Sequence, residues 1–312
     1  MRVEMRDPVQ FSHKSHQGQR QRESARPQQS GDSFQFNQET PTVSKLQFGN
    51  PANASTATSV KAQVNTSYYD PKADQAAVQA YYGGGLESFD GFNPSQLYDR
   101  LSEAVTKPHH PLAYKPDNNL YPQVDRHPDG NLYCIYSGGG PMFVGDDNHG
   151  ESPMKGGYNC EHVVPQSWFQ KKSTPRGDLH HLFACEIECN SIRGNAVLAD
   201  FNINGAAGYQ KADHGALDQT SNRFSPESGR GEVARGTLYF MLRYPGQIGD
   251  SANEYSTKDL PTLIKWAKED PPNEYEKHRN VQIQKMQGNR NPLIDFPQLL
   301  EKIDFSKGVG HY

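Results

Sequence analysis

Residues 158–195 read YNCEHVVPQSWFQKKSTPRGDLHHLFACEIECNSIRGN and contain an unusually dense set of chemically reactive side chains. They include Glu161, three histidines and several basic residues, and glycine-containing segments lie on both sides. Packing alone does not require such a collection. We therefore expect the remainder of the chain to serve as a frame for this segment, and its chemistry to indicate the function.

The composition separates a tail from a folded region. The chain has 312 residues, of which 34% are hydrophobic, and its mean hydropathy of -0.88 is low for a chain that is folded throughout. Residues 1–65 are rich in Gln, Ser, Arg, Asn, Thr and Pro and lack hydrophobic periodicity, which is typical of disorder. We expect a disordered tail over 1–65 and one folded domain over 66–312.

Charge and hydropathy limit which partners the protein can bind and what can be said of its cellular location. The net charge of -4 provides no overall basic field to attract nucleic acid, although a local groove could still do so. The first residues lack the apolar run of a secretory signal, and no segment approaches the ~18 apolar residues of a membrane span. We expect no membrane contact, and the residues alone leave the compartment open.

Periodicity and turn residues outline the frame around the central stretch. An apolar and aromatic run at 132–136 predicts a strand, and DLHHL at 178–182 predicts a second short strand. ECNSIRGN resembles the first turns of a helix. Capping residues and apolar spacing predict further helices after Pro71, after Asn93, over 231–244, over 256–270 and over 273–287.

Three interpretations of the central stretch are open on the residues alone. In the first, the carboxylate of Glu161 and the side-chain carbonyl of Asn190 hold a hard divalent cation beside a histidine that deprotonates water. Neighbouring side chains of a strand point to opposite faces, so Glu161 and His162 can share such a site only through a twist or bulge.

The other two interpretations involve zinc or no special chemistry. A zinc site would use Cys160, His162, Cys185 or Cys189, but three residues separate the last two cysteines, and no C-x2-C or H-E-x-x-H pattern occurs. Alternatively, the histidines are ordinary core or surface groups and Glu161 is a solvated acid. The fourth cysteine is Cys134, and an even count permits either disulfides or free thiols.

Several blocks of the chain resemble the bacterial endonuclease I family. They are YNCEHVVPQSWF at 158–169, DLHHL at 178–182, Asn190, Arg193 and Asn195, with IYSG at 135–138 and longer blocks at 231–245 and 265–295. The resemblance covers about residues 66–305. It implies a mostly helical α+β domain built on a ββα-metal finger, and a secreted or periplasmic nuclease, with a cytoplasmic location not excluded because no signal peptide is visible.

The resemblance assigns roles to individual residues. His162 matches the general base, and Glu161 and Asn190 match the ligands of one divalent cation, for which Mg²⁺ is expected first and Mn²⁺ or Ca²⁺ are alternatives. Arg176 is the candidate for a catalytic arginine at the scissile phosphate. Two further residues, Arg193 and His180, are expected to contact the substrate.

The expected activity is metal-dependent hydrolysis of DNA by a monomer, with little sequence preference and with RNA as a second substrate to test. The main alternative is a non-catalytic nucleic-acid-binding protein on the same fold. We expect QGNRNP at 287–292 to form a loop near the active site. Basic residues of the last helices would either contact phosphates or form a solvated face; they are Lys265, Lys268, Lys277, Arg279, Lys285 and Arg290.

One segment departs from the family pattern. Many relatives continue after the DLH motif through a proline-containing loop, whereas this chain has FACEIEC at 183–189. A disulfide between Cys185 and Cys189, or carboxylates of Glu186 and Glu188 near the cation, would alter the metal affinity. The role of Asn190 depends on which of these occurs.

Overall fold

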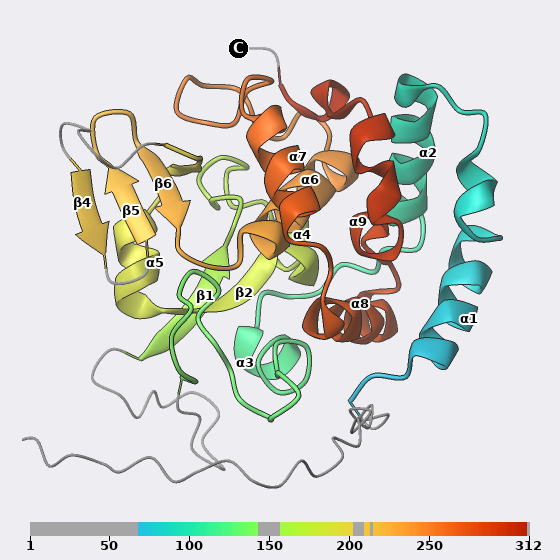
Figure 1. Ribbon diagram of the computed structural model, residues 1–312, viewed down its shortest axis with the longest axis horizontal. Coiled ribbons are helices and arrows are strands. Elements are labelled where there is room, and N and C mark those ends of the chain that lie inside the picture. Colours follow the sequence, from blue (N-terminus) through green and yellow to red (C-terminus); the bar gives the residue numbers. More distant parts are fainter. Residues whose placement is uncertain (1–67, 143–156, 202–208, 213–214, 311–312) are drawn as a thin grey trace, which may run out of the picture. The chain divides into compact units, whose positions relative to one another are not determined.

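The computed structural model describes residues 68–142, 157–201, 209–212 and 215–310, so the tail predicted over 1–65 lies outside the described residues (Figure 1). The fold is α+β with more helix than strand. None of the described helices has the length and apolar character of a membrane span. The α-helices are α1 Pro71–Tyr82, α2 Pro94–Thr106, α3 Pro116–Asn119, α4 Ser173–Arg176, α5 Ile187–Arg193, α6 Arg230–Arg243, α7 Leu260–Glu269, α8 Glu274–Gln287 and α9 Pro292–Asp295.

The strands form two separate sheets. Strand β1 (Tyr158–His162) pairs with β2 (Leu182–Glu186) in antiparallel register from Tyr158 opposite Glu186 to His162 opposite Leu182, without a bulge. Helix α5 follows β2 directly, which gives a ββα unit. The second sheet has the order β3-β6-β5-β4, with strands Val197–Leu198, Arg223–Pro226, Gly215–Asp218 and Tyr209–Ala212 in that order.

The predicted helices are confirmed, and local capping explains where they begin. Asn93 accepts a hydrogen bond from the Gln96 backbone, and the Gln96 side chain reaches back to the Asn93 N–H, which completes a capping box at the start of α2. Asn273 caps α8 in a similar way by accepting from the Glu276 N–H. At its C-terminal end, Gly288 adopts a left-handed conformation that glycine tolerates.

Helix α6 forms the centre of the core and supports the ββα unit. It is buried along nearly its whole length and packs against α7, α2 and the 3-10 helix η2 (Leu179–His181) (Figure 1). A Cβ atom at Gly236 would lie 3.1 Å from His180 O and 3.3 Å from Val163 Cγ2. The absence of a side chain at this position therefore lets α6 approach the segments that carry the histidines.

The two predicted strands outside 158–162 are corrected by the structure. At 132–136 there is only an isolated bridge between Leu132 and Met142, because the chain turns at Ile135 and Tyr136. The DLHHL segment begins with a 3-10 turn, because Asp178 Oδ1 accepts a hydrogen bond from the His180 N–H at 3.1 Å and favours a turn. The second strand starts only at Leu182.

A buried network of hydrogen bonds fixes the start of η2 in the core. The Asp178 carboxylate accepts hydrogen bonds from Tyr239 Oη at 2.8 Å, Tyr244 Oη at 2.9 Å and Gln287 Nε2 at 2.8 Å. Gln287 Oε1 in turn accepts from the Leu179 N–H at 3.1 Å. The segment at 287–292 does contain a loop, between the end of α8 and the start of α9, but its polar side chains are buried and hold the core together.

The basic residues of the last helices are mostly committed to ion pairs. Arg279 and Arg290 are buried, with Asp125 as the partner of Arg279 and with Asp295 at 2.6 Å from Arg290. The exposed Lys268 contacts Glu301 at 2.6 Å. These contacts favour a structural role over a phosphate-binding face for this part of the chain.

We expect the buried His180 to make the fold sensitive to acid. Burial lowers the pKa of His180 to about 4, with Asp178 opposing this only partly. An unfolded histidine has a pKa near 6.5, so between about pH 6.5 and 4 the unfolded state binds more protons and the free energy of unfolding falls as the pH falls. The contribution of His180 is on the order of 1.4 kcal/mol per pH unit.

Urea unfolding of wild type and His180→Asn at several pH values measures this contribution. The variant should lose less stability than wild type on acidification. Equal slopes for the two proteins between pH 6.5 and 4 would contradict the prediction.

Candidate active site

A cavity of about 520 Å³ opens where β1, the following turn and the end of α5 meet. Both neighbours Glu161 and His162 line it, because β1 ends at His162 and the chain bends away there. Its wall also includes residues of three other segments, namely Tyr114, Gln166, Lys171, Asn190, Arg193 and Asn195. The end of β1 and the bend at residues 163–164 thus bring Glu161 and His162 to one site, and the register of β1 contains no bulge.

Glu161 is a buried carboxylate with defined partners. It is only 2% exposed, and its Oε1 accepts hydrogen bonds from Tyr136 Oη at 2.6 Å and Arg193 Nη1 at 2.7 Å. Burial raises the pKa of Glu161, whereas Arg193 and Tyr136 oppose that change. These two partners fix the carboxylate at the wall of the cavity and favour its ionised form.

Asn190 has a side-chain carbonyl oxygen that is available to coordinate a cation. Its Nδ2 donates to Cys160 O at 3.3 Å and to Asn159 Oδ1 at 2.7 Å. Because a backbone carbonyl can only accept, the contact with Cys160 fixes which end of the amide faces β1. The side-chain oxygen Oδ1 of Asn190 makes no hydrogen bond to any residue that the structure describes, so it can act as a ligand, whereas the backbone oxygen accepts from the Gly194 N–H.

This donor set fits a hard divalent cation. One anionic and one amide oxygen line the same cavity, and Mg²⁺, Mn²⁺ and Ca²⁺ prefer such ligands and retain several waters. The positive charge of Arg193 beside Glu161 lowers the attraction for a cation but opposes the rise in the pKa of the carboxylate that burial causes. Glu161 and Asn190 are the residues that would hold the ion.

His162 is oriented by a backbone carbonyl. Its Nε2 lies 3.1 Å from Arg176 O, which is an acceptor only, so in the neutral ring Nε2 carries the proton and Nδ1 has the free lone pair. Burial, with a smaller effect of His181, lowers the pKa of His162 well below its usual value. The imidazole is therefore neutral near pH 7, and Nδ1 can accept a proton.

Arg176 is not itself part of the cavity wall, but its side chain contacts two residues of that wall. Its Nε donates to Gln166 Oε1 at 2.7 Å, and its guanidinium stacks over the Tyr114 ring at 4.6 Å. Both partners line the cavity. The terminal guanidinium nitrogens make no hydrogen bond within the described part of the chain, which leaves them free for an anion.

The chain matches known nucleases along most of its length. The family model for endonuclease I matches residues 94–298. An extracellular ribonuclease of Bacillus amyloliquefaciens is 30% identical over 77% of this chain and 82% of its own length. One from Bacillus subtilis (strain 168) is 30% identical over 75% and 81% of the two chains. An extracellular deoxyribonuclease of Aeromonas hydrophila is 30% identical over 43% of this chain and 64% of its own.

The chain belongs to the endonuclease I family. Nucleases of this family act on phosphodiester bonds, so this endonuclease I family member is a hydrolase and its substrate class is nucleic acid. This result confirms the resemblance found in the sequence. The ββα unit of β1, β2 and α5 carries the candidate residues of its active site.

Of the two residues predicted to bind substrate, Arg193 lines the cavity and His180 does not. Arg193 reaches the cavity wall but is only 1% exposed, and its guanidinium also donates to the carbonyl groups of His162 and Val163. His180 is buried against Tyr239 and does not line the cavity. A direct contact between His180 and a substrate would thus require the fold to open.

The cysteines and acids of the FACEIEC segment lie away from this cavity. Neither Glu186 nor Glu188 is part of its wall, and Cys185 and Cys189 are buried free thiols. Cys160 is also a free thiol, so the structure contains neither the predicted disulfide nor a zinc site that joins Cys160 to His162 within the described residues. The added carboxylates therefore do not compete with Asn190.

Sequence reasoning missed the residues that position this site. Tyr136, which holds Glu161, belongs to the IYSG block that resembles the family, but its role required knowledge of a contact 25 residues away. Asn159 and Gln166 orient Asn190 and Arg176. Both are adjacent to recognised residues in the central stretch, although nothing in their spacing indicates these partners.

We predict that Arg193→Met strongly destabilises the protein. The substitution removes the counter-charge of a buried carboxylate and three hydrogen bonds to Glu161, His162 and Val163. Breaking a buried ion pair from one side costs about 3–5 kcal/mol. Urea unfolding at pH 7 measures the change in the free energy of unfolding.

The alternative role for Arg193 as a substrate contact makes the opposite prediction. In that case the variant would unfold like wild type and show only a higher KM. Arg176→Met is the matched control, because this arginine is only half-buried and its loss should leave the free energy of unfolding within about 1 kcal/mol of wild type.

Proposed function

We propose that the protein is a metal-dependent endonuclease that hydrolyses DNA and RNA with little sequence specificity, with a water activated by His162. The observation that carries this proposal is that His162, Glu161 and Asn190 all line one cavity. In this respect the unit would be a ββα-metal finger, with an α+β frame around it.

His162 would act as the general base. Its Nε2–H is occupied by Arg176 O, so a water bound in the cavity can deliver its proton only to Nδ1. The same carbonyl stabilises the imidazolium that forms after proton transfer. His162 can return this proton to solvent once the phosphodiester bond has been broken.

Glu161 and Asn190 would hold one divalent cation, Mg²⁺ in the first instance. When bound, such a cation neutralises charge on the phosphate oxygens and on the leaving oxygen. Arg193 and Tyr136 keep the Glu161 carboxylate in place for this purpose. The two protein ligands leave coordination positions for water and for a phosphate group.

Arg176 would bind the scissile phosphate. Its free terminal nitrogens can donate two parallel hydrogen bonds to phosphate oxygens, and Tyr114 and Gln166 limit the motion of the side chain. Lys171, an exposed residue of the cavity wall, adds positive charge on the same side. Contacts of this kind recognise the backbone and not the base, which agrees with low sequence specificity.

Two relatives support the inclusion of RNA and an extracellular site of action. The Bacillus extracellular ribonucleases match more of this chain than the Aeromonas deoxyribonuclease does. We infer that the protein acts outside the cytoplasm, on both nucleic acids and as a monomer. A non-catalytic nucleic-acid-binding role is disfavoured because Glu161, His162 and Asn190 are all present and oriented.

His162→Ala should reduce cleavage about 10²- to 10⁴-fold, since the substitution removes the general base. Binding of DNA should be retained, because the phosphate contacts are made by other residues. Nicking of a supercoiled plasmid and cleavage of a labelled RNA, each with and without EDTA, measure the effect. His110→Ala, at an exposed histidine outside the cavity, is the control and should cleave like wild type.

Wild-type-like cleavage by His162→Ala would overturn the assignment of the base. Absence of any metal-dependent cleavage by the wild-type protein would favour the non-catalytic alternative. Discrete plasmid fragments in place of a smear would contradict the expected low specificity.

Asn190→Ala should raise the Mg²⁺ concentration needed for half-maximal cleavage by about tenfold or more. Loss of a residue that only hydrogen-bonds to a metal ligand already costs about 10- to 100-fold in metal affinity, and loss of a ligand itself should cost at least as much. Cleavage should recover at high Mg²⁺. An unchanged Mg²⁺ dependence would remove Asn190 from the set of ligands. Asn195→Ala, at another asparagine of the cavity wall, is the matched control.

A further inference from the structure

Three of the four cysteines meet in the core although they are far apart in the sequence. Cys134 precedes the turn at Tyr136, Cys185 is in β2 and Cys189 is in α5. Their sulfur atoms all lie within 4.8 Å of one another, and Cys134 Sγ is 3.4 Å from Cys185 Sγ. All three are buried, and no other group of three potential metal-binding side chains is as close within the described residues.

The fold creates this cluster, and sequence spacing does not predict it. The Ile135 N–H donates to Ala184 O at 3.1 Å, which places Cys134 beside β2. Cys185 lies near the end of β2, and Cys189 lies in the first turn of α5, which follows directly. Cys160, which sequence analysis considered as a zinc ligand, lies on β1 outside the cluster.

We propose that Cys134, Cys185 and Cys189 form a binding site for a thiophilic d10 cation, Zn²⁺ or Cu⁺, separate from the oxygen-donor site at Glu161 and Asn190. The proposal goes beyond the nuclease activity and does not depend on it. Each thiol would release its proton to solvent when the cation binds.

The arrangement of the sulfur atoms favours a shared cation. A zinc ion about 2.3 Å from each sulfur holds the sulfurs roughly 3.8 Å apart, which is within the range found here. The cluster contains an odd number of thiols, so one disulfide would leave a third buried cysteine packed against it.

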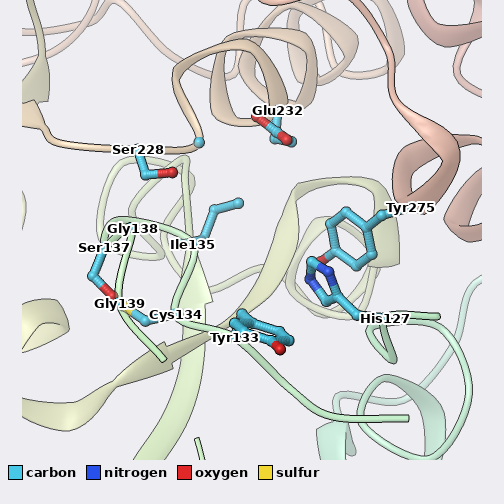
Figure 2. A pocket seen from close by; sticks show the side chains of 11 residues that line it. His127, Tyr133, Cys134, Ile135, Ser137, Gly138, Gly139, Ser228, Glu232 and Tyr275 are labelled. Atoms are coloured by element: carbon cyan, nitrogen blue, oxygen red, sulfur yellow. The ribbon is translucent and has the colours of Figure 1, made fainter. Parts of the chain in front are cut away.

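One residue of the cluster lies beside a pocket. Cys134 lies in the wall of a second cavity of about 210 Å³, where it is adjacent to Ser137 and Gly139 (Figure 2). This cavity is therefore a candidate route from solvent to the cluster. The same opening could admit a water as the fourth ligand of Zn²⁺, whereas Cu⁺ accepts three thiolates alone.

A cation at this position would cross-link three segments that support the candidate active site. It would join the segment that carries Tyr136, the strand that pairs with Glu161 and the helix that carries Asn190. Since a cation that binds only the folded state adds to the free energy of unfolding, we expect metal-loaded protein to melt at a higher temperature.

The test uses the full chain, reduced and handled without oxygen. The protein is titrated in separate arms with Co²⁺ as a spectroscopic substitute for Zn²⁺, with Zn²⁺ in competition, and with Cu⁺. We expect one equivalent of bound metal, sulfur-to-cobalt charge-transfer absorption, and a higher melting temperature in at least one arm. Mg²⁺ should produce none of these changes.

Variants assign the ligands. Cys134→Ser and Cys189→Ser should each lose at least tenfold in metal affinity and lose the charge-transfer band, whereas Cys160→Ser should retain both. Glu161→Gln should abolish cleavage but leave thiolate binding unchanged, which separates this site from the catalytic one. Preserved far-ultraviolet circular dichroism shows that the variants are folded.

Two results on wild-type protein would overturn the proposal without any variant. One is the absence of a bound thiophilic cation in both the Zn²⁺ and the Cu⁺ arms. The other is a disulfide between two of the three cysteines that persists in protein purified with metal present, detected by mass spectrometry of peptides without reduction. Retention of the charge-transfer band in Cys134→Ser would exclude this set of ligands.

Discussion

The buried carboxylate of Glu161 is the constraint on which the active site depends. An ionised carboxylate in the core is costly unless charged and polar groups surround it. Arg193 and Tyr136 meet this requirement, and each ties a different segment to β1. Arg193 also donates to His162 O and Val163 O, so the same guanidinium determines where β1 ends and where the chain turns away from the cavity.

A second buried carboxylate supports the histidine side of the cavity. Asp178 is enclosed and accepts hydrogen bonds from Tyr239, Tyr244 and Gln287, which join α6 and α8 to the start of η2. The backbone just before Asp178 contributes Arg176 O, the group that orients His162. The position of the proposed base therefore depends on a network in which His162 itself takes no part.

Oxygen and sulfur donors form two separate groups in and around the ββα unit. Glu161 and Asn190 line the large cavity, whereas Cys134, Cys185 and Cys189 cluster in the core. Hard cations prefer the first set of donors and soft cations the second, so two kinds of metal could bind without exchange between the sites. Cys189 and Asn190 can belong to different sites although they are neighbours in α5, because successive side chains of a helix point in different directions.

The local sequence determined the helices, the identity of the family and the candidate residues of the active site. Capping residues such as Asn93 and Asn273 act over three or four positions, and Glu161, His162 and Asn190 were recognisable from their motif. Tertiary structure decided the contacts between distant segments. The run at 132–136 has strand-like residues, but the hydrogen bond between Ile135 and Ala184 and the reach of Tyr136 to Glu161 impose a turn. Burial of Arg193 and His180, and the meeting of three cysteines, likewise depend on packing across the whole domain, because no local pattern encodes which distant side chain will neutralise a buried charge.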